Sequence, residues 1–350
     1  MSFTSRQRVM AVYEHELPDR VPCWCGASVE FWEKAKKELC LDDEGLRLRV
    51  RDDFRRVFAE YSGPDFPLEH KQATCRTVFG IERRGYGYGQ PTSHPLAGAT
   101  IKQVHEYPWP DPAWMDVSKI KSEALVFNGQ YAILGGDWSP FWHDLIDLVG
   151  MEELYIKMYS DPEVVDAIIQ HLVDYYFQVS KRIFDATADV IDIFFIGNDF
   201  GSQRGPLMSP QMFGRFMAPH LKRLSDLGHS YGLKIQMHCC GGIYELIPSM
   251  IDSGIDALHA VQPSCTGMDL NRLKSEFGDR IVFNGAIDSH HTLIRKDTAS
   301  VKEDTRKVLE VMMPHSGYIA GASHDTILEE TSVENVMAMF DAIYEYGSYS

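Results

Sequence analysis

The segment Leu233–Gly242, LKIQMHCCGG, combines two side chains that bind metal ions with a strand pattern that would bring them together. Alternate side chains of a β-strand lie on the same face, so His238 and Cys240 would project to one side and Met237 to the other. Zinc in proteins is bound by imidazole and thiolate groups, and a catalytic zinc site keeps one position open for water or substrate. Two ligands alone do not make a site, since a histidine at the end of a strand often has only a structural role.

A third candidate ligand lies near the C-terminus, where the apolar run that begins at Tyr318 ends in His324. In a barrel of parallel strands the carboxyl ends of all strands open on the same side, so this ring could reach the earlier pair. The alternative is that His324 caps the helix that follows, although Asp325 or Thr326 would do so better. His238, Cys240 and His324 are therefore candidate ligands of a zinc site, and the structural roles of the two histidines remain the alternative.

Polar residues also follow other expected strands, at the positions where barrel enzymes place their catalytic groups. Asp199 follows an apolar run that ends at Ile196, and Asp288 follows a run that begins at Ile281. Both carboxylates are candidate catalytic groups, although Asp199 could instead only shape the turn. The side chains that we expect to bind substrate are Trp138, Gln203, Gln262 and Asn284.

The elements that must position these residues follow a repeated pattern. Short apolar runs alternate with longer amphipathic segments, which indicates β-α units and a parallel sheet. The expected strands are 20–24, 131–135, 190–196, 233–238, 257–261, 281–285 and 318–321, and the expected helices are 162–184, 210–231, 243–253, 298–313 and 333–346. An open doubly wound sheet is the alternative, but no glycine-rich phosphate loop follows an early strand. We therefore predict an α/β fold with a single (β/α)8 TIM barrel domain over residues 1–350.

The stretch 61–114 departs from this pattern because it is rich in proline and aromatic residues. It contains the run GYGYG at 85–89, which is incompatible with a helix and predicts a loop or a short hairpin over one end of the barrel. This irregular N-terminal excursion is either a substrate lid or an ordinary surface segment.

Composition excludes several classes of partner. The chain of 350 residues has a formal net charge of −16 and a pI near 5.3. Nucleic acids and anionic membranes attract clustered lysine and arginine, so neither is an expected partner. No apolar run approaches the roughly 20 residues that span a bilayer, and the start lacks the apolar core of a signal peptide. Seven cysteines, an odd number spread over a long chain, favour reduced thiols and a cytoplasmic location.

Several motifs in order along the chain resemble the uroporphyrinogen decarboxylase superfamily. They are Pro18–Pro22 (PDRVP), Asp199–Gln203 (DFGSQ), Met208–Pro210 (MSP), His238–Gly241 (HCCG), Gly254–Asp256 (GID), Phe283–Gly285 (FNG) with Asp288, and Ser332–Asn335 (SVEN). The resemblance implies a (β/α)8 barrel and one of two activities. One is decarboxylation of uroporphyrinogen without a cofactor, and the other is zinc-dependent methyl transfer that involves corrinoid proteins.

The resemblance favours the methyltransferase branch. True decarboxylases share an N-terminal Arg-Gln-Ala-Gly-Arg-Tyr stretch that binds substrate carboxylates, whereas Cys23–Glu30 of this chain reads CWCGASVE and contains no arginine. The methyltransferases are similar to this chain at His238 and Cys240. Their further ligand from the last strand is usually a cysteine, and the matching residue in this chain is His324.

The implied reaction has a small methyl donor or acceptor, such as a methoxy compound, a methylamine or a thiol. Since no part of the chain resembles a corrinoid-binding domain, the corrinoid would be carried by a separate protein. The alternatives are a uroporphyrinogen decarboxylase-like carboxy-lyase of porphyrin biosynthesis and a non-catalytic barrel that binds small molecules. A homodimer is compatible with each of these functions.

Overall fold

The computed structural model describes residues 3–85, 89–187 and 189–349. Residue contacts divide the chain into two compact units. The first consists of Met1–Val57, Ser122–Gly135 and Ala188–Ser350, and the second consists of Phe58–Lys121 and Gly136–Thr187. No helix in the described part of the chain is both long and apolar enough to cross a membrane.

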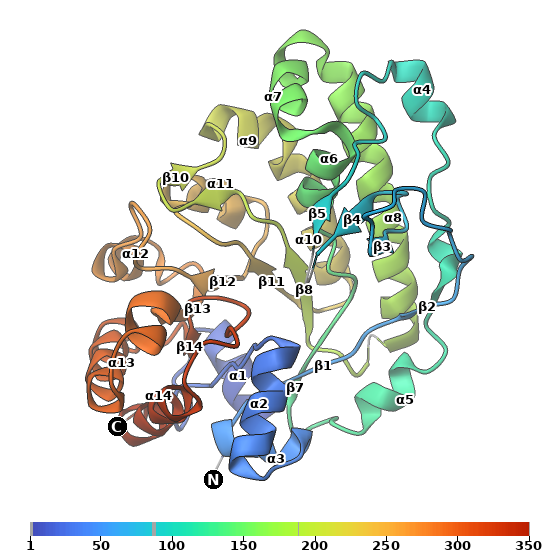
Figure 1. The fold of residues 1–350 in the computed structure, drawn as a ribbon. Helices are drawn as coiled ribbons and strands as arrows, with labels where there is room; N and C mark the ends of the chain where they lie inside the picture. The colour runs from blue at the N-terminus through green and yellow to red at the C-terminus, as the bar shows by residue number, and fades with distance from the viewer. Residues whose placement is uncertain (1–2, 86–88, 188, 350) are drawn as a thin grey trace. The chain divides into compact units, whose positions relative to one another are not determined.

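A seven-stranded parallel sheet forms the centre of the first unit (Figure 1). In spatial order its strands are β1 (Phe54–Arg56), β7 (Ala132–Gly135), β8 (Ile193–Gly197), β11 (Lys234–His238), β12 (Ala257–Val261), β13 (Val282–Ile287) and β14 (Tyr318–Ala322). Most of these strands are buried along their whole length, as parallel strands covered on both faces should be. Six of the seven expected strands are thereby confirmed, with small shifts at their ends.

The expected strand at 20–24 is wrong, and the sheet uses β1 instead. Cys23 makes only isolated parallel bridges, one to Asp52 beside β1 and one to Ala320 of β14. The backbone N–H of Trp24 donates to the carbonyl of Ala320 at 2.9 Å. A regular ladder is interrupted because Pro22 has no backbone N–H to donate. The segment around Cys23 nevertheless lies between the two edge strands of the sheet.

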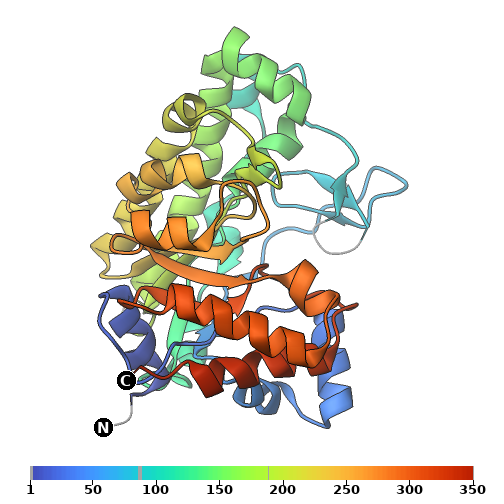
Figure 2. The same ribbon diagram turned by 90° about the vertical axis from the view of Figure 1, so that its left-hand side faces the viewer.

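Helices precede, connect and follow the strands of this unit. They are α1 (Ser5–Tyr13), α2 (Val29–Leu39), α3 (Asp43–Val50), α9 (Pro210–Phe216), α10 (Ala218–Ser230), α11 (Ile247–Asp252), α12 (Leu270–Phe277), α13 (Thr298–Met312) and α14 (Val333–Tyr346), with short turns η2 (Tyr244–Leu246) and η3 (Ser289–Ile294). Figure 2 shows α13 and α14 packed side by side. The helix expected at 210–231 is divided at Met217, because Pro219 near the start of α10 cannot continue a helix from the preceding turn.

The second unit contains most of the irregular stretch. Its elements are β2 (Glu60–Tyr61), β3 (Cys75–Arg76), β4 (Glu82–Arg84), β5 (Gln90–Pro91), α4 (Ile101–Glu106), η1 (Pro112–Trp114), β6 (Met115–Asp116), α6 (Phe141–Val149), α7 (Met151–Ser160) and α8 (Pro162–Thr187), while α5 (Ile120–Leu125) crosses the boundary. β4 and β5 pair antiparallel, so the expected hairpin is present. Residues 86–88 of the GYGYG run lie outside the described residues.

Asp52, which pairs with Cys23 at the edge of the sheet, makes the stability of the fold depend on pH. Burial raises the pKa of this carboxyl to about 6, although the Arg47 guanidinium lies 2.8 Å away. A carboxyl whose folded pKa exceeds its unfolded value destabilises the fold as it ionises. The quantity to follow is the unfolding free energy of wild type minus that of Asp52→Asn. We expect this difference to fall by up to about 3 kcal/mol as the pH rises from 4 to 6.

The measurement is denaturant unfolding of both proteins at half-unit pH intervals. Taking the difference cancels the other titrating groups, and above pH 7 it should become constant. A difference that does not vary between pH 4 and pH 7 would show that Asp52 ionises normally in the folded protein.

Candidate metal centre

The ends of the neighbouring strands β8 and β11 place three metal-binding side chains together. His238 is the last residue of β11 and pairs with Gly197, the last residue of β8. The chain beyond each strand then presents Cys240 and Asp199. The backbone N–H of Cys240 donates to Oδ1 of Asp199 at 2.8 Å, which joins the two loops.

Two glycines allow these loops to approach each other. Gly241 has a φ of +93°, and a Cβ atom there would lie 2.5 Å from the backbone carbon of Gly201. A Cβ atom on Gly201 would lie 2.6 Å from the carbonyl oxygen of Cys240. Any larger residue at either position would therefore separate Asp199 from Cys240.

The three side chains have the distances of a ligand set. Nε2 of His238 lies 3.2 Å from Sγ of Cys240 and 3.3 Å from Oδ1 of Asp199. One ligand atom from each residue lies within 4.8 Å of the others. The sequence interpretation had placed Asp199 among the catalytic residues, whereas the geometry also makes it a possible ligand.

The electrostatics favour a thiolate next to a charged imidazole. Burial alone would lower the pKa of His238, but the Cys240 thiolate and hydrogen bonds to Asp199 and Cys240 hold it well above the ordinary value. Burial alone would raise the pKa of the Cys240 thiol, but the charge of His238 and hydrogen bonds from His238 and His324 lower it. A thiolate is the form of cysteine that binds metal ions or acts as a nucleophile.

His324, the third predicted ligand, contacts only part of this group. Interaction with the Cys240 side chain raises the pKa of its imidazole. Its Nδ1 lies 3.0 Å from the carbonyl oxygen and 3.1 Å from the backbone nitrogen of Thr326, so it donates to the first or accepts from the second according to its tautomer, and either contact orients the ring. Within the described residues, however, the set of three mutually close ligand atoms contains Asp199 and not His324.

A second group of possible ligands shares His238 and was not predicted. Nδ1 of His238 lies 3.2 Å from Nδ1 of His259 in β12, and Nε2 of His259 lies 3.9 Å from Oδ1 of Asp325. Burial lowers the pKa of His259 to about 3, so this ring is neutral at neutral pH. Burial alone would raise the pKa of Asp325, but the positive charge of His238 contributes most to lowering it.

A signal for His259 was present in the sequence. It is the one polar residue of the run ALHAV, and the register of β11 and β12 pairs it directly with His238. That register depends on the closed arrangement of the strands, so the pairing could not be derived from the run alone.

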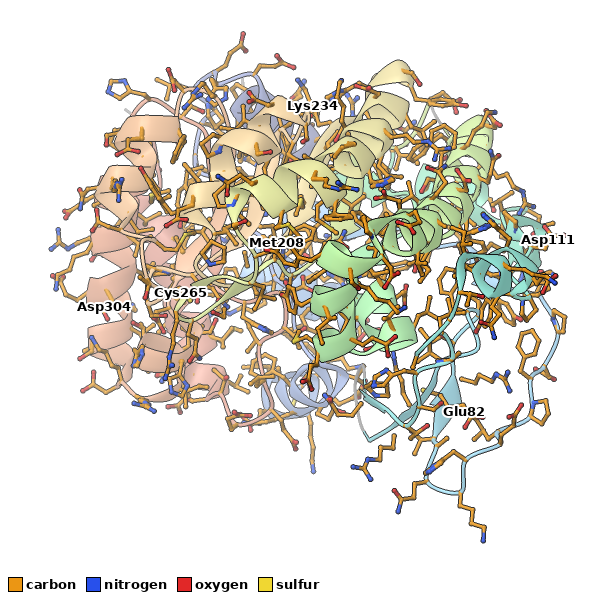
Figure 3. All side chains as sticks on the ribbon, turned by 90° about the horizontal axis from the view of Figure 1, so that it is seen from above. Glu82, Asp111, Met208, Lys234, Cys265 and Asp304 are labelled. Atoms are coloured by element: carbon orange, nitrogen blue, oxygen red, sulfur yellow. The ribbon has the colours of Figure 1, made fainter. Side chains whose placement is uncertain are left out.

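A cavity of about 500 Å³ in the first unit brings together four of the predicted residues. Gln203, Gln262, Asp288 and His324 all line it, and Cys265, labelled in Figure 3, contributes a thiol. The other lining residues are Ser264, Ser289, His290, His291, Ile294, Ser323, Thr326, Leu328 and Thr331. The wall that the described residues form thus contains one carboxylate and no lysine or arginine.

Two cavity residues also organise the surrounding loops. Oε1 of Gln262 accepts a hydrogen bond from the backbone N–H of Gly241 at 2.9 Å. The NH2 group of the Gln262 side chain therefore points away from Gly241. Oδ1 of Asp288 accepts the backbone N–H groups of His290 and His291 at 2.9 and 2.6 Å and so caps η3. Asp288 thus lines the cavity and also has a structural role as a cap, which was not predicted from the sequence.

The remaining two predicted residues lie elsewhere. Asn284 is fully buried in β13, where its Nδ2 donates to Oε1 of Gln236 at 3.2 Å, and that oxygen also accepts the hydroxyl of Tyr13 at 2.9 Å. This polar network joins β13, β11 and α1 of the first unit and does not line the cavity. Trp138 belongs to the second unit.

Comparison with known proteins gives a family and a fold. A family model for uroporphyrinogen decarboxylase matches residues 99–346. The structure of a methyltransferase from Methanosarcina mazei is similar over 99% of both chains, with a TM-score of 0.71 and 20% sequence identity. A B12-independent methionine synthase from Shewanella sp. W3-18-1 is similar over 64% of this chain and 65% of its own, with a TM-score of 0.40 and 16% identity. None of the curated proteins matches this chain.

Proposed function

Because this chain belongs to the uroporphyrinogen decarboxylase family, we propose that it is the methyltransferase of a corrinoid system and depends on zinc. The observation that carries the proposal is the meeting of Asp199, His238 and Cys240, whose ligand atoms lie within 4.8 Å of one another. The similarity over 99% of both chains to a methyltransferase from Methanosarcina mazei supports it. The segment around Cys23 bridges both edges of the sheet. It would take the place of the eighth strand and so close the barrel.

The donor atoms fit zinc. Carboxylate oxygen, imidazole nitrogen and thiolate sulfur are all ligands that zinc accepts, and three protein ligands leave a fourth position open. His238 and Cys240 belong to both possible sets. The geometry favours Asp199 as the third ligand, whereas the sequence pattern favours His324, whose ring interacts with Cys240.

When bound, zinc would lower the pKa of a coordinated thiol or hydroxyl and so supply the nucleophile or activate the leaving group. The protein residues would bind and orient the methyl compound. The NH2 group of Gln262 can donate a hydrogen bond into the cavity, while the carboxylate of Asp288 can accept one from the substrate or take its proton. His324 lines the cavity and contacts Cys240, so it connects the substrate region with the metal ligands.

The cavity wall argues against the decarboxylase alternative. Uroporphyrinogen carries eight carboxylates, and binding so many negative charges calls for cationic side chains. The described residues around the cavity include the carboxylate of Asp288 and no lysine or arginine. A small methoxy compound, methylamine or thiol carries no such requirement. The corrinoid would come from a separate protein, which is the partner that the proposal implies.

Metal analysis tests the proposal directly. We expect protein purified without chelators to contain about one zinc per chain and Cys240→Ala to contain almost none, because the thiolate is a ligand in either set. Asp199→Asn and His324→Ala identify the third ligand, since only the variant that lacks it should lose zinc. Cys40→Ala is the matched control, because Cys40 is exposed. Wild-type protein that is free of metal and still fails to bind added zinc would contradict the proposal.

A further inference from the structure

We infer that His259 is a positioning residue, which holds the His238 ring in the tautomer that binds metal through Nε2. This inference rests on the proposed metal site and adds a residue that does not itself touch the metal. It starts from the contact between the two rings, whose Nδ1 atoms lie 3.2 Å apart. His238 and His259 are directly paired in the register of β11 and β12, so the backbone sets this contact.

The geometry allows only one proton between the two nitrogens. If both Nδ1 atoms carried hydrogen the donors would clash, and if neither did the lone pairs would repel. Nε2 of His238 points to Cys240 and Asp199, so it must present its lone pair when a metal ion binds there. The proton of His238 is then on Nδ1 and is donated to Nδ1 of His259. His259 must in turn carry its own proton on Nε2.

The surroundings hold His259 in this orientation. The side chain is 1% exposed, and its ring centroid lies 4.7 Å from that of Trp24 and 5.4 Å from that of Phe195. Nε2 of His259 is buried without a hydrogen-bond partner among the described groups, and the nearby Oδ1 of Asp325 lies 3.9 Å away. A proton on Nε2 therefore faces a carboxylate, which favours the tautomer that the His238 contact requires.

Asparagine and leucine at position 259 separate this role from simple packing. The two side chains are nearly isosteric, but only asparagine has an oxygen, Oδ1, at the position of the histidine Nδ1 atom. Leucine should raise the zinc dissociation constant about 10–100-fold, as loss of a partner to a metal-binding histidine generally does. Asparagine should retain an affinity close to that of wild type. The measurement is competition with a chromophoric chelator, supported by the visible absorption spectrum of cobalt-substituted protein.

Stability should follow the opposite order, which distinguishes positioning from a structural role. Both substitutions leave a similar cavity, but asparagine also buries an amide that lacks a full set of partners, so it should unfold at the lower temperature. A packing role alone would give asparagine the weaker metal site. Leucine binding zinc as tightly as wild type, or asparagine losing as much affinity as leucine, would overturn the inference and leave the proposed function standing.

Wild-type protein also allows a test without substitution, in case neither variant folds. In 15N-histidine protein with bound zinc we expect a scalar coupling between the two Nδ1 atoms across the N–H···N hydrogen bond. Absence of this coupling in zinc-loaded wild type would overturn the inference. Wild type that binds no zinc at all would overturn the proposed function, and the inference with it.

Discussion

Replacing His238 with alanine is expected to reduce the proposed methyl transfer at least about a thousandfold. The imidazole belongs to both candidate ligand sets, and its Nε2 lies 3.2 Å from Sγ of Cys240, whose pKa its charge lowers. Without it the site loses a ligand and the charge that lowers the pKa of Cys240. Metal activation of a nucleophile contributes several kcal/mol, and each 1.4 kcal/mol corresponds to about a factor of ten in rate.

The assay is anaerobic demethylation of methylcobalamin by a small thiol, followed by absorbance. The methyl group moves to the thiol sulfur, the electron pair of the cobalt–carbon bond stays on cobalt as cob(I)alamin, and the thiol proton passes to solvent. His105→Ala, at an exposed residue of α4, serves as the control and should retain wild-type activity. Equal rates for His238→Ala and wild type would remove His238 from the reaction.

Replacing Asp53 with alanine should lower the free energy of unfolding by about 3–5 kcal/mol. The carboxylate is fully buried, and its oxygens lie 2.7 Å from Nη1 of Arg8 and 2.9 Å from Nη1 of Arg20. It also accepts the backbone N–H of Cys23 at 2.7 Å. Removing it leaves two largely buried guanidinium groups with less negative charge, and breaking a buried ion pair from one side costs this much.

Denaturant unfolding measures the effect, with Asp341→Ala as the matched control. Asp341 also pairs with an arginine, Arg49, at 2.8 Å, but both side chains are more than one third exposed. Exposed pairs contribute about 1 kcal/mol or less, so the control should remain close to wild type. Similar losses in the two variants would show that burial of Asp53 does not strengthen its interactions.

The sequence pattern predicted the parts of the fold and site that depend on local periodicity. Strand alternation placed His238 and Cys240 on one side of a strand end, and their ligand atoms lie 3.2 Å apart. Apolar runs likewise located β8 and β14, which carry Asp199 and His324 beyond their ends. The family resemblance, stated from ordered motifs, is confirmed by the match over residues 99–346.

The missed parts depend on contacts between distant segments. β1 has the sequence FRR, and its two arginines are not typical of a buried strand. Arg55 can be buried because its guanidinium donates hydrogen bonds to Glu44 and to two backbone carbonyls. The role of His259 could not be predicted from its own strand, because it depends on the register that pairs this residue with His238. Asn284 lies near the end of the expected strand 281–285, but it is the third residue of β13 and bonds Gln236 in a buried network. In each case tertiary partners decide the role of the residue.

The bridges of Cys23 also bear on how the protein forms during synthesis. Cys23 lies near the start of the chain, whereas one of its two neighbours, Ala320, lies close to the end. Joining such distant segments costs loop entropy before any contact compensates for it, so folds of this kind form slowly. During synthesis on the ribosome, the segment around Cys23 can pair with β14 only after β14 has emerged. Until β14 has been synthesised, the bridge from Cys23 to Ala320 cannot form and an edge of the growing sheet stays unpaired, which favours aggregation at that stage.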